Sequence, residues 1–269
     1  MAPRPARPSR YHARLPYADG RVRYSAAEHD VWATLLARQR LAIADVACDA
    51  FIDGLNVLEL PADQIPQLAE VSARLRRASG WEVVAVPALI PFGEFFALLA
   101  ARRFPAATFI RRREHLDYLQ EPDIFHELFG HAPLLTDPGF AEFTETWGRI
   151  GLAASKEDRV FLARLYWFTV EFGLLRQPGG TLKIYGGGIL SSPAETAHAL
   201  SGAPLLKPFD LIEVLRTPYR IDIVQPQYFV LDSLDTLQRL TAHELQAAVA
   251  EARRLGLHAP LFAPKPLAA

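Results

Sequence analysis

The chain has 269 residues, among them 29 Lys and Arg, 30 Asp and Glu, and a single cysteine, Cys48. Half of the residues are hydrophobic and 22% are charged, which is typical of a globular protein and excludes a disordered or fibrous one. One cysteine excludes a disulfide framework and a zinc site built on cysteines. The net charge of −1 gives no reason to expect nucleic acid as a partner, and no apolar run reaches the roughly 18 residues that span a bilayer. We therefore expect a cytoplasmic globular protein with no nucleic-acid or membrane partner.

The first part of the chain predicts a basic, proline-rich arm followed by helices. Residues 1–22 begin with MAPRPARPSR, and we expect this arm to be flexible. Ser25-Ala-Ala-Glu28 is a capping box and opens an amphipathic helix that we expect to run to about Phe51. Asp63 is a candidate cap for a second helix, which we expect to end at Gly80.

From residue 81 onward, short strand patterns alternate with helical ones. The patterns predict, in chain order, a strand over 81–86, a helix over 91–103, extended chain over 107–111, helices over 138–154 and 157–174, a β-hairpin over 174–185, a helix from Ser192, a strand over 227–231 and a helix over 234–255. Asp137-Pro138 supplies a cap and a first-turn proline. We find no repeat and no low-complexity linker. The sequence therefore predicts one mainly α domain with a small β portion over 23–256, and a tail over 257–269.

Two histidines stand close together in the segment EPDIFHELFGH, which covers residues 121–131. Zinc proteases use the pattern H-E-x-x-H, in which the histidines are four residues apart and share a helix face. His126 and His131 are five residues apart, which separates them by about 140° on a regular helix. Both can face one metal ion only if the helix bends or ends between them, and Gly130 is where such a break is easiest. The spacing weakens the protease interpretation.

Glu171 is the second unusual polar residue. It lies in VFLARLYWFTVEFGLL, residues 160–175, where Arg164 is the only other charged residue. A helix this apolar is buried over most of its surface, and a buried carboxylate is costly unless it is paired or binds a cation. Two histidines and one carboxylate match the facial triad of non-haem Fe(II) oxygenases and also a catalytic zinc site. A third alternative is a helical binding or scaffold protein in which Glu171 pairs with Arg164.

Four longer strings add a resemblance to a known family. They are EPDIFHELFGH (121–131), YWFTVEFGL (166–174), YGGGILSS (185–192) and QPQYFV (225–230). In these strings, and in their order and separation, the chain resembles the pterin-dependent aromatic amino acid hydroxylases over roughly residues 24–240. The resemblance is greatest to the short bacterial phenylalanine hydroxylases. It implies a single catalytic domain of that fold, with Fe(II) as the metal and with O2 and a tetrahydropterin (tetrahydrobiopterin or a related bacterial pterin) as cosubstrates.

The resemblance also implies roles for individual residues. His126, His131 and Glu171 would bind the iron, and Glu127 would act in catalysis, facing the pterin and an iron-bound water. The positions that match the family's amino acid site are Arg111 for the substrate carboxylate, Trp167 and Phe172 for the ring, and Gly188 and Ser191. The positions that match its pterin site are Ala88, Leu89, Ile90 and Phe95, with Phe95 stacked on the pterin. Asp123 and Tyr166 would contact these residues and hold them in position. Asp123 would also cap the helix that carries the histidines.

The implied reaction is that of a phenylalanine 4-monooxygenase. Trp167 stands where tryptophan hydroxylases carry Phe, and Ile221 stands where tyrosine hydroxylases carry Asp, which favours a ring without a hydroxyl. Leu119-Gln120 replaces a Thr-Pro pair of the animal enzymes, so a hydroxyl that helps to hold the substrate is missing. We expect a monomer, because the regulatory domain and tetramerisation helix of the animal enzymes have no counterpart. The alternatives are a hydroxylase of tyrosine or tryptophan, and a zinc hydrolase with Glu127 as base.

Overall fold

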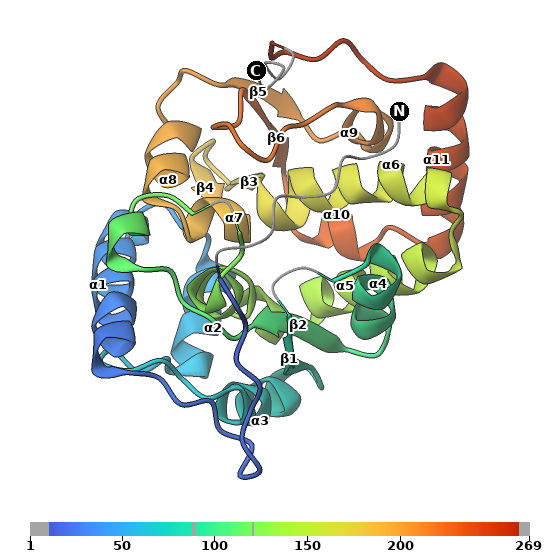
Figure 1. Cartoon of the computed structure of the whole chain (residues 1–269). Coiled ribbons are helices and arrows are strands. Elements are labelled where there is room, and N and C mark those ends of the chain that lie inside the picture. The colour runs from blue at the N-terminus through green and yellow to red at the C-terminus, as the bar shows by residue number, and fades with distance from the viewer. Residues whose placement is uncertain (1–10, 88–89, 120, 264–269) are drawn as a thin grey trace, which may run out of the picture.

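The computed structural model describes residues 11–87, 90–119 and 121–263, and helices make up the larger share of this part (Figure 1). The helices are α1 (Ala26–Ile43), α2 (Asp49–Leu58), α3 (Leu68–Ala78), α4 (Phe92–Ala100), α5 (Pro138–Ala153), α6 (Lys156–Tyr166), α7 (Gly187–Leu190), α8 (Pro193–Ala199), α9 (Leu211–Arg216), α10 (Asp235–Gln238) and α11 (Ala242–Leu255). Short 3-10 turns cover Arg113–His115 and Leu134–Thr136. The predicted fold class, mainly α with a small β portion, is confirmed.

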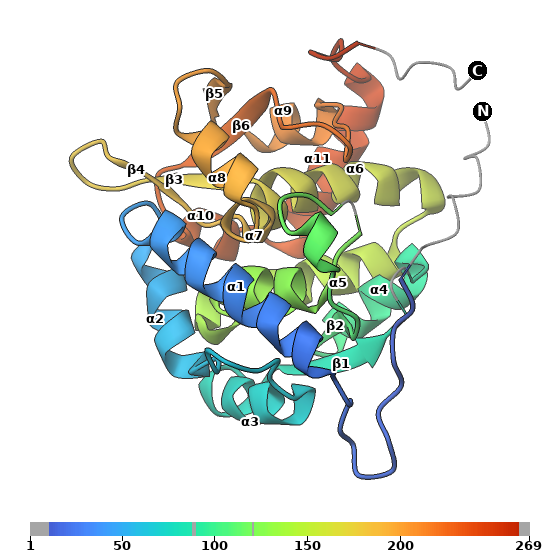
Figure 2. The same ribbon diagram turned by 60° about the vertical axis from the view of Figure 1, so that its left-hand side comes forward.

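The β portion consists of two small sheets. The strands are β1 (Glu82–Val86), β2 (Arg103–Ala107), β3 (Gly173–Arg176), β4 (Leu182–Ile184), β5 (Leu205–Pro208) and β6 (Gln227–Leu231). Strands β1 and β2 pair in parallel, and the second sheet has the order β4-β3-β6-β5 with only the β3–β4 hairpin antiparallel. In Figure 2, α1, α2 and α3 lie together, with the four-stranded sheet and α9 toward the other end of the molecule. The predicted strands 81–86 and 227–231 and the hairpin are confirmed.

The capping box at Ser25 is confirmed, but α1 is shorter than predicted. The Ser25 side chain accepts a hydrogen bond from the Glu28 N–H, and the Glu28 carboxylate accepts one from the Ser25 N–H. The helix ends before the expected limit near Phe51, and α2 starts separately. The peptide groups on both sides of Ala47 bond instead to the backbone of Ile184 in β4, with N···O distances of 2.8 and 2.9 Å. A tertiary contact therefore overrides the amphipathic pattern here.

The region between α2 and α5 also departs from the prediction in detail. Gln67 precedes the first residue of α3, so Asp63 is not its cap, and Gly80 follows the helix with a φ of 79°. The helix expected over 91–103 is α4 and stops earlier, because Arg102 turns the chain with a φ of 56°. Strand β2 follows at once, ahead of the extended stretch expected over 107–111. Its pairing with β1 decides where it starts.

The last third of the chain has more elements than predicted. Asp137 and Ser192 cap α5 and α8 as expected. The helix expected over 234–255 is divided into α10 and α11, because Thr241 forms a capping box of its own with Glu244. The sequence did not predict α7, β5 or α9, which are short and lack a clear period.

One hydrophobic core runs through the described part of the chain, and its largest fully buried side chains include Trp32, Trp81 and Trp147. A smaller cluster joins Tyr11 to Phe109, whose ring centroids are 4.8 Å apart. Residues 1–10 and 264–269 lie outside the described residues, so the predicted limits of the arm, the domain and the tail stay predictions.

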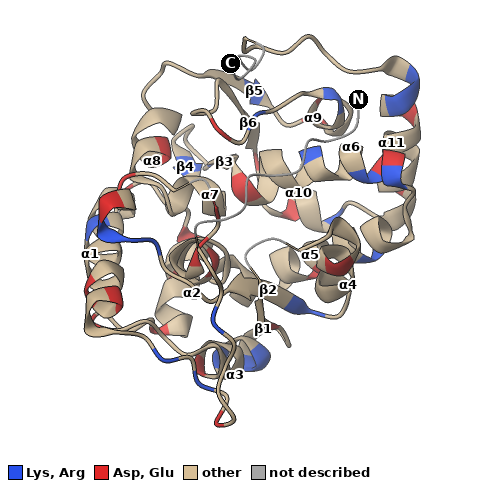
Figure 3. Cartoon of the chain, in the orientation of Figure 1, with Lys and Arg blue, Asp and Glu red and all other residues tan. Residues whose placement is uncertain are grey.

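Charged residues of both signs are interspersed over the helices in Figure 3, and neither sign gathers on one side in that view. No helix in residues 11–87, 90–119 and 121–263 is both long enough and apolar enough to cross a membrane.

Candidate metal centre and substrate site

His126 and His131 lie at the two ends of a π-helical turn, His126–His131. In a π-turn a backbone N–H bonds to the carbonyl five residues earlier, and such turns are frequent at functional sites. Here the Ala132 N–H donates to the Glu127 carbonyl at 3.2 Å. The wider turn brings residues that are five apart to the same side. The expectation that the helix bends or ends at Gly130 is therefore wrong, because the helix widens instead.

Glu171 ends a second π-helical turn, Trp167–Glu171, which continues α6. The Phe172 N–H donates to the Trp167 carbonyl at 2.9 Å, again a five-residue bond. The helix expected over 157–174 therefore ends before its predicted limit, and β3 follows at Gly173. A wide turn thus positions each of the two segments that carry the candidate ligands.

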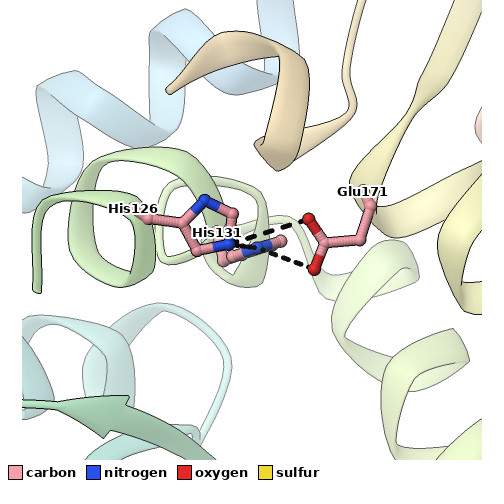
Figure 4. A group of neighbouring side chains, drawn as sticks. All are labelled: His126, His131 and Glu171. Atoms are coloured by element: carbon pink, nitrogen blue, oxygen red, sulfur yellow. Dashed lines mark hydrogen bonds and ion pairs between the residues drawn. The ribbon is translucent and has the colours of Figure 1, made fainter. Parts of the chain in front are cut away.

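The three side chains meet between these turns (Figure 4). His131 Nε2 lies 2.9 Å from His126 Nε2 and 3.3 Å from Glu171 Oε1. His126 Nε2 lies 3.7 Å from Glu171 Oε2. One ligand atom from each residue falls within 4.8 Å of the others. Such a set leaves coordination positions open, and its chemistry fits either Fe(II) or a catalytic zinc ion.

Ser191 decides which nitrogen of His126 carries the proton. The Ser191 hydroxyl donates its only hydrogen to the Gly187 carbonyl at 2.8 Å. The same oxygen lies 2.9 Å from His126 Nδ1, so it must accept a hydrogen bond from a protonated Nδ1. A neutral imidazole then has its lone pair on Nε2, the atom that faces His131 and Glu171. His126 is thereby held in the tautomer that a metal ion requires.

The charges in the cluster suit a divalent cation. Burial lowers the pKa of His126 to about 4, although the Glu171 carboxylate opposes this shift. Burial alone would raise the pKa of Glu171, but the two histidines outweigh it and hold this pKa below its ordinary value. Near pH 7 the cluster therefore offers an ionised carboxylate and a neutral imidazole at His126.

Glu127 carries a half-buried carboxyl group next to this cluster. Burial raises its pKa well above the ordinary value, and the charges of Glu171 and Asp123 raise it further. Its carboxylate has no hydrogen bond or ion pair with any other described residue. A carboxyl group with a raised pKa keeps its proton to a higher pH than an ordinary carboxyl group does, which is a property of groups that transfer protons.

Arg111 is buried, whereas the side chains of Arg112 and Arg113 are more than half exposed. Its Nε and Nη2 donate to the two carboxylate oxygens of Asp123 at 2.8 and 2.9 Å. Asp123 also accepts from the backbone N–H groups of Arg111 and His126, at 3.0 and 3.1 Å. The Arg111 charge outweighs burial and holds the pKa of Asp123 low. Nη1 of Arg111 makes no hydrogen bond within the described part of the chain, so it is available to another anion.

Three rings form an aromatic stack beside Glu171. The Trp167 ring centroid lies 4.4 Å from that of Phe172 and 4.5 Å from that of Tyr219, which is nearly parallel to it at 17°. The indole Nε1–H donates to Gln225 Oε1 at 3.0 Å. Sequence reasoning missed Tyr219 and Gln225, although QPQYFV was one of the matching strings. A glutamine between apolar residues was the available signal.

Two glycines let α7 approach the cluster closely. A Cβ atom on Gly187 would lie 2.6 Å from His131 Nδ1. A Cβ atom on Gly188 would lie 2.8 Å from Glu171 Oε2 and 3.1 Å from the Phe172 ring. Any side chain at Gly188 would therefore displace the Glu171 carboxylate or the Phe172 ring.

Phe95 and Tyr166 link α4 to the cluster. Phe95 meets Tyr166 edge to face, with ring centroids 5.5 Å apart, and Tyr166 lies 6.4 Å from the His131 ring by the same measure. Phe95 and Ile90 are half-buried. Of the other residues expected to contact the pterin, Ala88 and Leu89 lie outside the described residues. So does Gln120 of the Leu119-Gln120 pair.

The structure does not support the expected pairing of Glu171 with Arg164 or the expected role of Ile221. Arg164 does not pair with Glu171: its Nη1 donates to the Val160 carbonyl, its Nε finds no partner among the described residues, and the guanidinium packs on the Phe161 ring. The alternative of a scaffold with a Glu171–Arg164 pair is therefore wrong. The Ile221 side chain is 56% exposed, so it forms no buried apolar wall that could select the substrate ring.

The comparisons with known proteins agree with this geometry. A family model described as "Biopterin-dependent aromatic amino acid hydroxylase" matches residues 10–250. A Pseudomonas aeruginosa protein named phenylalanine-4-hydroxylase is 58% identical over 96% of this chain and 98% of its own. The apo structure of the phenylalanine hydroxylase from Colwellia psychrerythraea 34H is 54% identical, with a TM-score of 0.90 over 93% of this chain and 97% of its own.

A third similar protein is the phenylalanine hydroxylase of Chromobacterium violaceum, solved with bound oxidised Fe(III). It is 43% identical, with a TM-score of 0.86 over 94% of this chain and 91% of its own. The family model covers most of the chain, and the identities extend over nearly its full length. The chain belongs to the biopterin-dependent aromatic amino acid hydroxylases.

Proposed function

We propose that this chain is a phenylalanine 4-monooxygenase, which converts L-phenylalanine, O2 and a tetrahydropterin to L-tyrosine and a 4a-hydroxypterin. The observation that carries the proposal is the convergence of His126, His131 and Glu171, from two π-turns, in a chain of this family. The choice of phenylalanine as the substrate rests on the relatives named above, because the two with the highest identities carry the name phenylalanine hydroxylase.

The same three residues would hold Fe(II). The relative with bound iron supports this choice over zinc, which the donor set alone does not exclude. Bound iron and the tetrahydropterin together supply the activation of O2. Ser191 holds the His126 tautomer, and Gly188 leaves the space that the Glu171 carboxylate occupies.

Arg111 is proposed to bind the carboxylate of the amino acid substrate. Asp123 fixes one edge of the guanidinium and leaves Nη1 free to donate. The Arg111 guanidinium is therefore already held in place, so little side-chain entropy is lost when the substrate binds. Trp167 and Phe172 would then hold the aromatic ring next to Glu171.

The pterin is proposed to lie near Phe95 and Ile90, with Ala88 and Leu89 completing its loop. Phe95 is half-buried against Tyr166, so one part of the ring is accessible for stacking. Glu127 would accept or hold a proton beside the pterin and the metal, as its raised pKa allows.

Anaerobic loading with Fe(II), followed by an assay with phenylalanine, a tetrahydropterin and O2, tests this function. We expect one metal ion per chain and tyrosine as the product. His131→Ala should bind no iron and form no tyrosine, whereas Asp117→Ala, at an exposed ion pair, should behave as the wild type. Stoichiometric zinc with peptidase activity and no pterin-dependent turnover would favour the zinc hydrolase instead.

The same assay compares substrates. We expect phenylalanine to be preferred over tyrosine and tryptophan, and a higher kcat/KM for either of those would overturn this part of the proposal. We further propose a cytoplasmic monomer, which light scattering on the purified protein and fractionation of expressing cells test.

A further inference from the structure

Gln225 joins three parts of the molecule through one side chain and one peptide group. Its Oε1 accepts from the Trp167 indole at 3.0 Å, and its Nε2 donates to the carbonyls of Arg220 and Ile223, both at 2.9 Å. The Gln225 N–H donates to the Glu195 carboxylate at 3.1 Å. Gln225 is 2% exposed, and every polar atom of its amide has a partner. A buried amide satisfied this fully fixes the groups that it bonds.

The loop that Gln225 closes carries Tyr219, the outer ring of the aromatic stack. Tyr219 lies nearly parallel to Trp167, which contacts Phe172, and Phe172 and Glu171 both border Gly188. Gln225 therefore acts on Trp167 twice, directly through the indole N–H and indirectly through the loop that holds Tyr219. Because Trp167 packs on Phe172, the position of the Gln225 amide also affects the position of the Phe172 ring beside Glu171.

The other side of Gln225 is anchored in α8. The Glu195 carboxylate, which is 8% exposed, accepts from the Gln225 N–H with one oxygen and from the Tyr228 hydroxyl with the other. The His198 ring Nε2 lies 3.1 Å from the Gln225 carbonyl. Both peptide groups that flank this residue are thus tied to a helix, which gives the amide a rigid base.

We propose that Gln225 is a positioning residue for the substrate ring, acting through Trp167, and that Tyr219 forms the outer part of the substrate's aromatic wall. This inference rests on the proposed function, because the ring that the stack holds is that of phenylalanine. Gln225 has no hydrogen bond to any of the three candidate metal ligands, so its loss should misplace the ring and leave metal binding intact. A misplaced ring lets O2 take two electrons from the pterin and leave as hydrogen peroxide, without forming tyrosine.

The test compares Gln225→Leu with Gln227→Leu. Gln227 is a matched control because it is also buried, lies two residues along the same segment, and has no side-chain hydrogen bond within the described residues. We expect Gln225→Leu to raise the KM for phenylalanine about 3- to 10-fold, as the loss of a buried hydrogen bond suggests. It should also lower the tyrosine formed per pterin oxidised, while bound iron and the KM for the pterin stay at wild-type values.

Trp167→Phe removes the same hydrogen bond from the other side and serves if Gln225→Leu yields no folded protein. It should show the same loss of coupling, and the double variant should lose less than the sum of the two single effects. Equal KM and coupling in Gln225→Leu, Gln227→Leu and the wild type would overturn the inference. Wild-type enzyme that makes no tyrosine would instead contradict the proposed function, so the two failures are distinguishable.

Discussion

Replacement of Asp123 by Ala should destabilise the protein strongly. Asp123 is fully buried and accepts four hydrogen bonds, three from Arg111 and one from the His126 N–H. Its removal leaves the buried Arg111 guanidinium without a counter-charge. Breaking a buried ion pair on one side costs about 3–5 kcal/mol, because the remaining charge is neither solvated nor paired. For a chain of this size that loss lowers the melting temperature by roughly 6–20 °C.

The assay is denaturant unfolding at pH 7, with Asp117→Ala as the control. Asp117 pairs with Arg38 at 2.7 Å, but its side chain is 87% exposed, so its loss should cost less than about 1 kcal/mol. Asp123→Ala should also raise the KM for phenylalanine, since Arg111 is no longer held in place. If Asp123→Ala costs no more than Asp117→Ala, the claim that this buried pair organises the site is refuted.

The pH dependence of the same pair gives a second check on it. The pKa of Asp123 is lower in the folded chain than its unfolded value of about 3.9. The unfolded state therefore binds the proton first, and the stabilisation is present above pH 3.9 and lost as the pH falls toward the folded pKa. Asp123→Asn should flatten the acid side of the stability curve. An unchanged slope would contradict this assignment.

Three further predictions concern the metal centre. Ser191→Ala removes the acceptor for His126 Nδ1 and should weaken Fe(II) binding about 10- to 100-fold by metal titration, with the fold unchanged by circular dichroism. Gly188→Ala should displace the Glu171 carboxylate, because the added Cβ would lie 2.8 Å from Glu171 Oε2. Wild-type iron affinity in that variant would contradict this prediction. In the apoprotein the pKa of His126 falls from 6.5 to about 4 on folding. The unfolded state then binds the extra proton, so stability should decrease as the pH drops from 6.5 toward 4, by at most about 1.4 kcal/mol per pH unit from this residue; His126→Gln should lack that slope.

Local signals predicted much of the fold. The capping box at Ser25, the Asp137-Pro138 cap and the β3–β4 hairpin depend on residues close in the chain, and each formed where expected. The predicted limits of helices and strands were wrong where a distant segment of the chain bonds to the same backbone groups. The bridge between Ala47 and Ile184 ends α1 early, and nothing near Ala47 in the sequence announces a strand partner more than a hundred residues away.

The three candidate metal ligands were predictable from the sequence, but their geometry was not. The charge of Glu171 in an apolar segment and the pair of histidines were visible in the sequence, and the family resemblance joined them. The π-turns were not predictable, because a widened turn depends on how the segment packs rather than on its own propensity. For the same reason Tyr219 and Gln225 were missed: their role comes from a loop that folds back onto Trp167.

A phenylalanine 4-monooxygenase inserts one oxygen atom from O2 into phenylalanine. The most direct measurement is a turnover of the Fe(II)-loaded protein with phenylalanine, a tetrahydropterin and ¹⁸O₂, with mass analysis of the product. We expect tyrosine that carries a single ¹⁸O atom, formed only when the pterin is present, and no product from His131→Ala. Tyrosine whose oxygen comes from water, or turnover without pterin, would contradict it.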